Sequence, residues 1–280
     1  MEMCLNVVSR YIHWIEVSFV ISPAFINRLY YFLCSDYSDK VMSIEIRINS
    51  AQCISEILYK KMPVEKKSAI IAEIGVIDLL EQFKSTSDPS FAECLTEICI
   101  AVSSCCIDSF DSKLDDPDFL LTLSRILQLL LFFLGQPNYD VSGDVLSSVQ
   151  EFTTKILRFS GQGKIDQDFV DRLIVQLVQI ILPLSRIPSW YNFETGGDPE
   201  VKFDNFRSAL SNFLLSILES NAATAGPIVF QYLSSGLASS SIEKENSLFI
   251  LYTVTTARSL GNALLSKDGV FSCIFESLFT

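Results

Sequence analysis

Apolar side chains recur every three or four residues along almost the whole 280-residue chain, and this spacing limits its fold more than any other feature. In the segment 169–181, for example, apolar residues stand at positions 169, 170, 173, 174, 177, 178 and 181. Such spacing gives a helix a broad apolar stripe, whereas the period-two alternation typical of strands is nowhere sustained. The pattern therefore predicts an all-α protein.

Residues that favour a first helical turn divide the chain into helix pairs. Proline stands at the second position of the dipeptides 22–23, 62–63, 116–117 and 226–227, and Asp166 is expected to cap a further helix without proline. The expected pairs are 3–16 with 23–34, 42–61 with 64–84, 89–111 with 117–134, 142–160 with 167–187, 199–220 with 227–239, and 243–265 with 269–280. Second helices then begin about every 40 to 60 residues, as in HEAT-type or armadillo-type repeats.

We therefore expect residues 1–280 to form one continuous HEAT-repeat α-solenoid, in which about six antiparallel helix hairpins stack into a superhelix. Neither end has the polar outer face that a terminal repeat normally carries. Met1 opens almost directly into a helix, and the segment 270–279 is strongly apolar. These features predict a section of a longer array.

Charge and hydropathy limit the partners. The net charge of −12 opposes long-range attraction to nucleic acid or anionic lipid, so any RNA contact must come from a local basic strip. The longest apolar runs, 126–134 and 177–184, are shorter than the roughly 18 residues of a spanning helix. Charged residues also interrupt the N-terminal apolar stretch, which argues against a signal peptide. We expect an intracellular protein without a membrane partner.

The eight cysteines lie almost entirely within apolar helical patterns, which predicts buried thiols in a reducing compartment. They are Cys4, Cys34, Cys53, Cys94, Cys99, Cys105, Cys106 and Cys273. The group at 94–106 lacks the paired short spacings of a zinc site, and the chain has a single histidine. We expect no metal and no other cofactor.

Three stretches resemble the exportin-t family, the transfer-RNA exporters of the importin-β (karyopherin) superfamily. Tyr-Ile-His-Trp-Ile-Glu at 11–16 and Phe-Ile-Asn at 25–27 are similar to the family's aromatic-x-x-Trp-Ile-Asp segment and to the start of its next helix. Ala-Gln-Cys-Ile-Ser-Glu-Ile at 51–57, with Lys-Lys-Met at 60–62, is similar to another family helix. Tyr-Asn-Phe-Glu at 191–194, continuing through Asp198, Phe203 and Arg207, is similar to a family loop and helix.

This resemblance implies a nuclear export receptor that shuttles between nucleus and cytoplasm. Its cargo would be transfer RNA, held on the concave surface that the second helices line, and Ran GTPase in its GTP form would control loading. The main Ran site is expected outside this chain. The alternative is a HEAT-repeat scaffold, or an importin-type adaptor, that binds a peptide or folded protein along the same concavity.

Six basic residues are candidates for contacts with RNA phosphates: Lys60, Lys61, Lys66 and Lys67 around one hairpin turn, and Arg125 and Arg172 on second helices. Scattered cations are sufficient for such contacts, because the backbone charge of RNA does not depend on sequence. The alternative for each is an ordinary solvated cation.

The longest connection combines aromatic side chains with carboxylates, and its candidate partner-binding residues are Trp190, Tyr191, Phe193, Glu194, Asp198 and Glu200. The carboxylates either contact a basic partner or repel RNA and confine it to the basic strip. The aromatic residues either bind a partner or seal a hydrophobic seam.

Catalysis has no support in the sequence. His13 stands beside Trp14 without a nucleophile motif, so we expect it to be a surface or packing residue. The Gly-Gln-Gly-Lys run at 161–164 follows a helix and lacks the remaining positions of a phosphate-binding loop. We expect no enzymatic activity and no small-molecule substrate.

Overall fold

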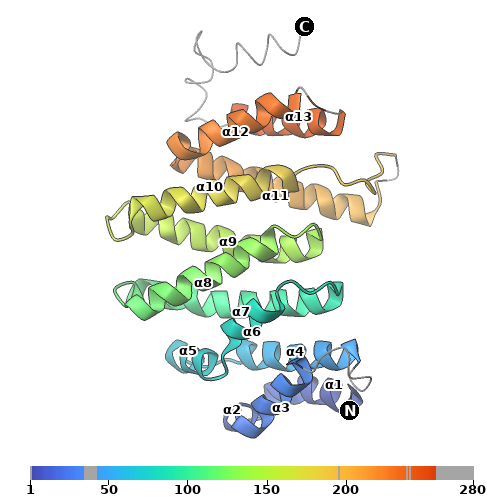
Figure 1. Cartoon of the computed structure of the whole chain (residues 1–280), viewed down its shortest axis with the longest axis vertical. Coiled ribbons are helices and arrows are strands. Elements are labelled where there is room, and N and C mark those ends of the chain that lie inside the picture. The colour runs from blue at the N-terminus through green and yellow to red at the C-terminus, as the bar shows by residue number, and fades with distance from the viewer. Residues whose placement is uncertain (1, 35–42, 195, 238, 240, 257–280) are drawn as a thin grey trace. The chain divides into compact units, whose positions relative to one another are not determined.

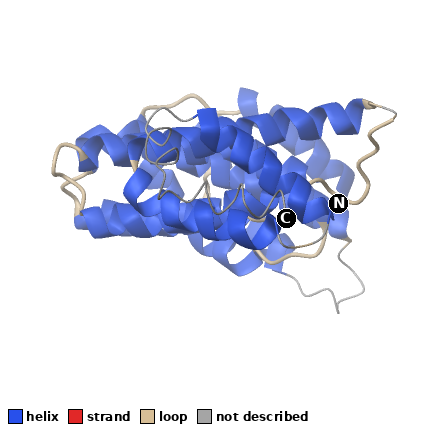
Figure 2. Cartoon of the chain, turned by 90° about the horizontal axis from the view of Figure 1, so that it is seen from above, coloured by secondary structure: helices blue, strands red, loops and turns tan. Residues whose placement is uncertain are grey.

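The computed structural model describes residues 2–34, 43–194, 196–237, 239 and 241–256. Within these residues every regular element is an α-helix or a short 3-10 helix, and Figure 2 shows no strand among them. The all-α prediction is confirmed. The helices form two compact units, residues 1–152 and 153–280, and the predicted single array of residues 1–280 remains an expectation.

The described residues of unit 1 form eight helices, one 3-10 turn and most of a ninth helix. They are α1 (Glu2–Tyr11), the 3-10 turn (Ile12–Trp14), α2 (Val17–Val20), α3 (Pro23–Cys34), α4 (Ile44–Tyr59), α5 (Val64–Glu73), α6 (Val76–Phe83), α7 (Pro89–Lys113) and α8 (Pro117–Leu134). The long helix α9 (Tyr139–Ser160) crosses from unit 1 into unit 2.

The core of unit 1 forms around α4 and α7, which lie side by side (Figure 1). Helix α4 also contacts α1 and α3, and α7 contacts α5, α6 and α8. Ile54 and Ile57 on α4 and Phe91 on α7 are fully buried. The rings of Phe110 on α7 and Phe152 on α9 meet edge to face with centroids 6.5 Å apart. Apolar surface removed from water on both sides of α7 therefore holds these layers together.

Unit 2 continues with α10 (Gln167–Leu184), α11 (Asp198–Ser220), α12 (Ala222–Leu237) and α13 (Ser241–Thr256). Helices α10 and α12 contact each other, as do α11 and α13, so successive hairpins stack like helix on like helix. Leu177, Leu214 and Ile250 lie in the buried apolar core between them. This arrangement is the packing expected of HEAT-type hairpins.

One buried asparagine on α13 joins that helix to α10, α11 and α12. The Asn246 amide nitrogen donates to the carbonyl of Leu182 at 3.0 Å and to the hydroxyl of Tyr232 at 2.8 Å. Its oxygen accepts from the hydroxyl of Ser185 at 3.0 Å and from the guanidinium of Arg207 at 3.5 Å. Since an unpaired buried amide is costly, these partners favour a single register of the four helices.

Aspartates begin three of the long helices, as the sequence indicates. Asp88 accepts from the backbone N–H of Phe91 at 2.8 Å, and Asp116 accepts from that of Asp118 at 3.0 Å, in each case with proline in the first turn. Asp166 accepts from Asp168 at 3.4 Å without a proline, so its predicted capping role is confirmed. These bonds satisfy backbone donors that a helix leaves free at its start.

The predicted first helix, 3–16, is wrong as a single element. Residues 3–16 contain the end of α1, the 3-10 turn and an extended residue at Ile15, and the short α2 follows in a stretch where no helix was predicted. The carbonyls of Ile12, His13 and Ile15 accept hydrogen bonds from the Lys60 ammonium at 2.6, 3.1 and 2.7 Å. Carbonyls directed at a cation do not continue an α-helical ladder, so the helix ends there.

The predicted helix 64–84 is also interrupted. Gly75 adopts φ +63°, a left-handed conformation that glycine reaches at no steric cost, and it separates α5 from α6. The hydroxyl of Tyr30 on α3 donates to the carbonyl of Ile74 at this break. Burial raises the pKa of Tyr30 above its ordinary value, so the hydroxyl stays protonated and remains a donor.

The start signal at 226–227 is wrong, because α12 begins at Ala222 and contains Pro227 in its interior. A proline near the start of a helix removes few hydrogen bonds, so the helix extends to the preceding turn. The predicted helix 269–280 and the end of the predicted helix 243–265 lie outside the described residues.

Helices α7 and α8 are each long and apolar enough to cross a membrane by length and composition alone. In the structure 67% of the relevant window of α7 and 50% of that of α8 are buried within the protein. Packing inside unit 1 therefore accounts for the apolar composition of α7, and for a large part of that of α8.

Replacing Lys60 with methionine should destabilise the chain by about 2–3 kcal/mol, because the buried carbonyl of Ile12 and the partly buried carbonyls of His13 and Ile15 lose a charged donor. Urea unfolding followed by circular dichroism measures this change. The neighbouring Lys61 is exposed, so Lys61→Met is the matched control and should shift stability by less than about 0.5 kcal/mol. Equal effects of the two substitutions would contradict the structural role of Lys60.

Candidate nucleic-acid and partner surfaces

The basic turn between α4 and α5 presents three cations. Lys61 and Lys66 are exposed and Lys67 is half-buried, and none of the three ammonium groups forms an ion pair or hydrogen bond with another described residue. They stand within seven positions of one another in a chain whose net charge is −12. An unpaired ammonium group can bind a phosphate without first losing a hydrogen bond or ion pair to the protein. Three of the four lysines predicted at this turn therefore remain candidates for phosphate contacts.

Lys60 does not belong to that set. Its side chain is buried at 8% exposure, and its three donor positions are occupied by three backbone carbonyls. A phosphate contact would require breaking those bonds. The spacing carried a signal for this role, because Lys60 lies three and seven positions after Ile57 and Cys53, two fully buried residues on one face of α4.

The two predicted arginines differ in their availability. Arg125 on α8 donates to both carboxylate oxygens of Glu81, at 2.9 and 2.6 Å, and also pairs with Asp78. The hydrogen bonds to Glu81 and Asp78 raise the pKa of Arg125 and lower that of Glu81. The charge of Arg125 is thus compensated within the protein. Arg172 on α10 is exposed and has no partner among the described residues.

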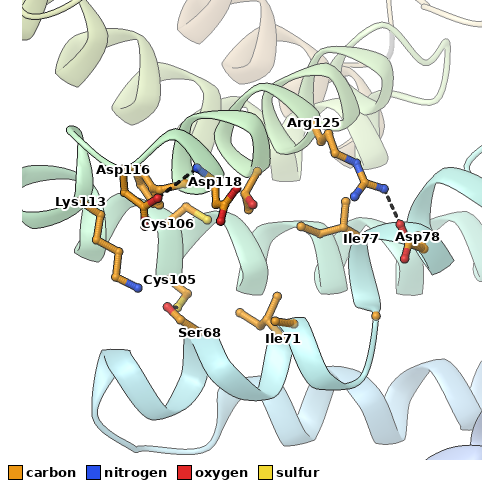
Figure 3. Close-up of a pocket in the computed structure, with 14 residues that line it drawn as sticks. Ser68, Ile71, Ile77, Asp78, Cys105, Cys106, Lys113, Asp116, Asp118 and Arg125 are labelled. Carbon is orange, nitrogen blue, oxygen red and sulfur yellow. Dashed lines mark hydrogen bonds and ion pairs between the residues drawn. The ribbon is translucent and has the colours of Figure 1, made fainter.

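A cavity of about 320 Å³ lies among α5, α7 and α8 in unit 1 (Figure 3). Arg125 reaches across one end to Asp78, and Lys113 extends along the other end toward Ser68. The Cys105 thiol lies 3.5 Å from the Ser68 hydroxyl. Burial raises the pKa of Cys106 to about 12, so this thiol is not a nucleophile near neutral pH.

The cysteines follow the prediction in part. Cys53, Cys94, Cys99, Cys105 and Cys106 are buried free thiols, whereas Cys4 and Cys34 are exposed and Cys273 lies outside the described residues. Among the residues that the structure describes, no group of three or more His, Cys, Asp or Glu side chains is arranged to hold a metal ion.

In the long connection, Trp190 and Tyr191 pack against the protein, whereas Phe193 is largely exposed. The Tyr191 hydroxyl donates to the Asp204 carboxylate, with oxygen–oxygen distances of 2.9 and 3.0 Å. The rings of Trp190 and Tyr191 both pack on the buried Phe203, with centroids 6.0 and 5.8 Å away. Phe193 is 75% exposed. Two rings thus seal a seam, as one alternative stated, while Phe193 remains available to a partner.

Of the three candidate carboxylates of this connection, two are exposed and one is buried. Glu194 and Asp198 are exposed, but Glu200 is buried at 8% exposure and its Oε1 accepts from the backbone N–H of Asn192 at 3.3 Å. A side chain at Gly197 would meet Glu200 Oε2 at 2.9 Å, so glycine allows this close approach. Glu200 therefore shapes the loop from within and is not a surface contact.

Arg207 and Glu245 were missed as a pair by sequence reasoning. The Arg207 guanidinium donates to Glu245 Oε2 at 2.8 Å and lies 3.8 Å from the ring centroid of Phe249. Arg207 is buried, and its pairing joins α11 to α13 beneath the aromatic loop. The residues are 38 positions apart, so helical spacing within one element could not reveal the contact.

Carboxylates cluster on α4, α7 and α9. Glu56 on α4 pairs with His13 at 2.7 Å, and Glu97 on α7 accepts from the Ser55 hydroxyl at 3.5 Å. Partial burial, reinforced by Asp144, Glu56 and Glu93, raises the pKa of Glu97. Burial and Asp140 raise the pKa of Asp144. These helices would repel a polyanion, whereas the α4–α5 turn would attract one.

Replacing Glu97 with glutamine should stabilise the chain slightly at pH 7.5, by a few tenths of a kcal/mol, since solvent screens a half-exposed carboxylate. A raised native-state pKa means that ionisation disfavours the folded state, so the penalty is absent below the ordinary glutamate pKa of about 4.3. Urea unfolding at pH 7.5 and pH 3.5 should show a gain only at pH 7.5. Glu151→Gln, at an exposed position of α9, is the control and should change stability at neither pH, and a loss of stability for Glu97→Gln at pH 7.5 would contradict the electrostatic explanation.

No protein-family model matches the chain. Curated proteins named Exportin-T do match it. The protein of Dictyostelium discoideum is 24% identical over 228 residues, which cover 77% of this chain and 20% of the relative. The human protein is 23% identical over 221 residues, which cover 75% of this chain and 22% of the relative. The protein of Yarrowia lipolytica is 24% identical over 164 residues, covering 57% of this chain and 15% of the relative.

The chain thus spans about a fifth or less of the length of these relatives. Its helix hairpins and its similarity to these proteins agree on an all-α fold of the HEAT-repeat type. The resemblance to exportin-T that the three sequence stretches indicated is confirmed by these matches.

Proposed function

We propose that this chain is a segment of a nuclear export receptor that contributes phosphate contacts to a transfer-RNA cargo. The observation that carries the proposal is the α4–α5 turn, where Lys61, Lys66 and Lys67 have no partner among the described residues of an acidic chain. Arg172 is a further unpaired candidate in unit 2. The similarity to proteins named Exportin-T supports this class of receptor.

The mechanism relies on charge position rather than on base readout. Side chains cannot enter the deep major groove of an RNA helix, so folded RNA is recognised by its shape and backbone. Carboxylates such as Glu56 on α4 and Glu97 on α7 disfavour RNA along these helices, while the basic turn between α4 and α5 favours it. In the proposed receptor, Ran in its GTP form controls loading from a main site outside this chain, and the protein shuttles between nucleus and cytoplasm.

A protein-binding scaffold, or importin-type adaptor, is the second candidate. The exposed ring of Phe193 and the largely apolar cavity next to it favour this alternative, because the residues that line the cavity include no cation to neutralise a phosphate. Neither candidate requires catalysis, and the buried thiols with raised pKa values are poor nucleophiles.

Reversing charge at the two exposed lysines of the turn, Lys61→Glu with Lys66→Glu, should weaken transfer-RNA binding by about tenfold or more in low salt. Each lost phosphate contact also releases about one counterion fewer, so the slope of log affinity against log salt should flatten by roughly two. Filter binding of the 280-residue chain across salt concentrations measures both quantities.

The matched control is Lys202→Glu with Lys244→Glu, which makes the same charge change at two exposed lysines of unit 2. It should lower affinity less and leave the slope nearly unchanged. If the turn variant keeps its affinity and slope, the turn lies outside the RNA path. If the unmodified chain ignores transfer RNA at low salt and binds a protein cargo, the scaffold function replaces this proposal.

A further inference from the structure

A second cavity, of about 300 Å³, lies in unit 2 between the aromatic loop and the start of α13. Ile187 and Pro188 of the loop and Ile242 of α13 supply aliphatic walls, Tyr191 and Phe193 supply aromatic walls, and Glu245 supplies the charge. Its volume is at the lower end of ligand sites and is suited to one large side chain. The basic turn of unit 1 contributes nothing to it.

The rings of Tyr191 and Phe193 form a corner, and contacts with other residues hold Tyr191 in place. The ring centroids of Tyr191 and Phe193 are 5.0 Å apart, with planes inclined by 67°. Tyr191 cannot swing away freely, because its hydroxyl is bound to Asp204 and its ring packs on Phe203. Phe193 and Ile242 are 75% and 49% exposed, so the cavity opens to solvent. Aromatic faces held in this way attract cations.

Glu245 is the charged residue of the cavity wall, and only one of its two carboxylate oxygens has a partner among the described residues. Glu245 Oε2 accepts from Arg207, whereas Oε1 has no partner among the described residues. The Glu245 side chain is 40% exposed, while Arg207 is buried behind it and is not part of the cavity wall. A phosphate would place its own acceptor oxygens against this unpartnered carboxylate oxygen, which is unfavourable. An uncharged apolar side chain would cover the free carboxylate oxygen without offering it a donor, which is unfavourable.

We propose that this cavity receives the side chain of an arginine or lysine from a protein partner. The aliphatic stem would lie against Ile187, Pro188 and Ile242, as long basic side chains commonly pack on apolar surface. The cationic head would reach the faces of Tyr191 and Phe193 and donate to Glu245 Oε1. This site goes beyond RNA binding and does not depend on it, since the RNA contacts proposed above use other residues.

Fluorescence of Trp190 can report on the site, because the chain has only two tryptophans and the Trp190 ring lies 6.3 Å from that of Tyr191. Trp14 is 86% exposed, so Trp14→Phe removes the other emitter with little expected effect on folding. The probe is the peptide N-acetyl-Gly-Arg-Gly-amide, titrated into the 280-residue chain. We expect a saturable change with a dissociation constant of roughly a millimolar, as one buried cation contact allows.

The matched probe is the same peptide with citrulline, which keeps the shape of arginine and lacks its charge. It should bind at least tenfold more weakly. Phe193→Leu, which removes an exposed ring, and Glu245→Gln, which can still accept from Arg207, should each weaken arginine-peptide binding by about three- to tenfold. Tyr252→Leu, at a 71% exposed position of α13 outside the cavity, should leave it unchanged.

Several results would overturn the proposal. Equal binding of the citrulline peptide would mean that the cavity does not select a cation. No saturable change up to about 50 mM peptide, well above the expected dissociation constant, would mean that it does not bind one. Unchanged affinity in both the Phe193 and Glu245 variants would place the peptide elsewhere. If transfer RNA displaced the peptide and Phe193→Leu also weakened RNA binding, a nucleobase would replace the basic side chain as the occupant.

Discussion

The Lys60 ammonium is the interaction on which the N-terminal part of unit 1 depends. One cation offers three donors, and the turn after α1 offers three carbonyls within 3.1 Å of it. These hydrogen bonds end α1 and stabilise the turn toward α2. They also join that turn to Lys60, which directly follows α4. Removing the cation takes a charged donor from these carbonyls, the buried carbonyl of Ile12 among them, which costs more than the loss of an ordinary surface contact.

Polar contacts of this kind matter in a helical stack because apolar contacts specify register weakly. Isoleucine and leucine faces tolerate small sliding motions with little change in buried area, whereas Asn246 satisfies its four hydrogen-bonding positions only in one arrangement of α10, α11, α12 and α13. Burial of apolar surface thus supplies most of the attraction in each unit. The buried polar side chains determine which register of the helices forms.

Local rules predicted most helix starts, and long-range contacts explain most of the errors. Asp88 and Asp116 precede proline and Asp166 caps without it, so their roles depend on neighbours two or three positions away. The Lys60 bonds and the Arg125 pairs join residues 44 to 48 positions apart, and no periodicity signals which cation meets which acceptor. The break at Gly75 was accessible in principle, since glycine within an apolar helix pattern often marks an end.

The same distinction between paired and unpaired charge separates the two kinds of surface on this chain. A basic residue in the sequence is a candidate for RNA only until the fold assigns it a carboxylate or carbonyl partner, as it does for Lys60 and Arg125. A carboxylate likewise attracts a partner only through oxygen atoms that the fold leaves free, as at Glu245. Net charge therefore describes the chain poorly as a binding surface, because an acidic protein can hold a polyanion at one turn and a cation in another unit when the charged groups at each place keep atoms that the fold leaves without a partner.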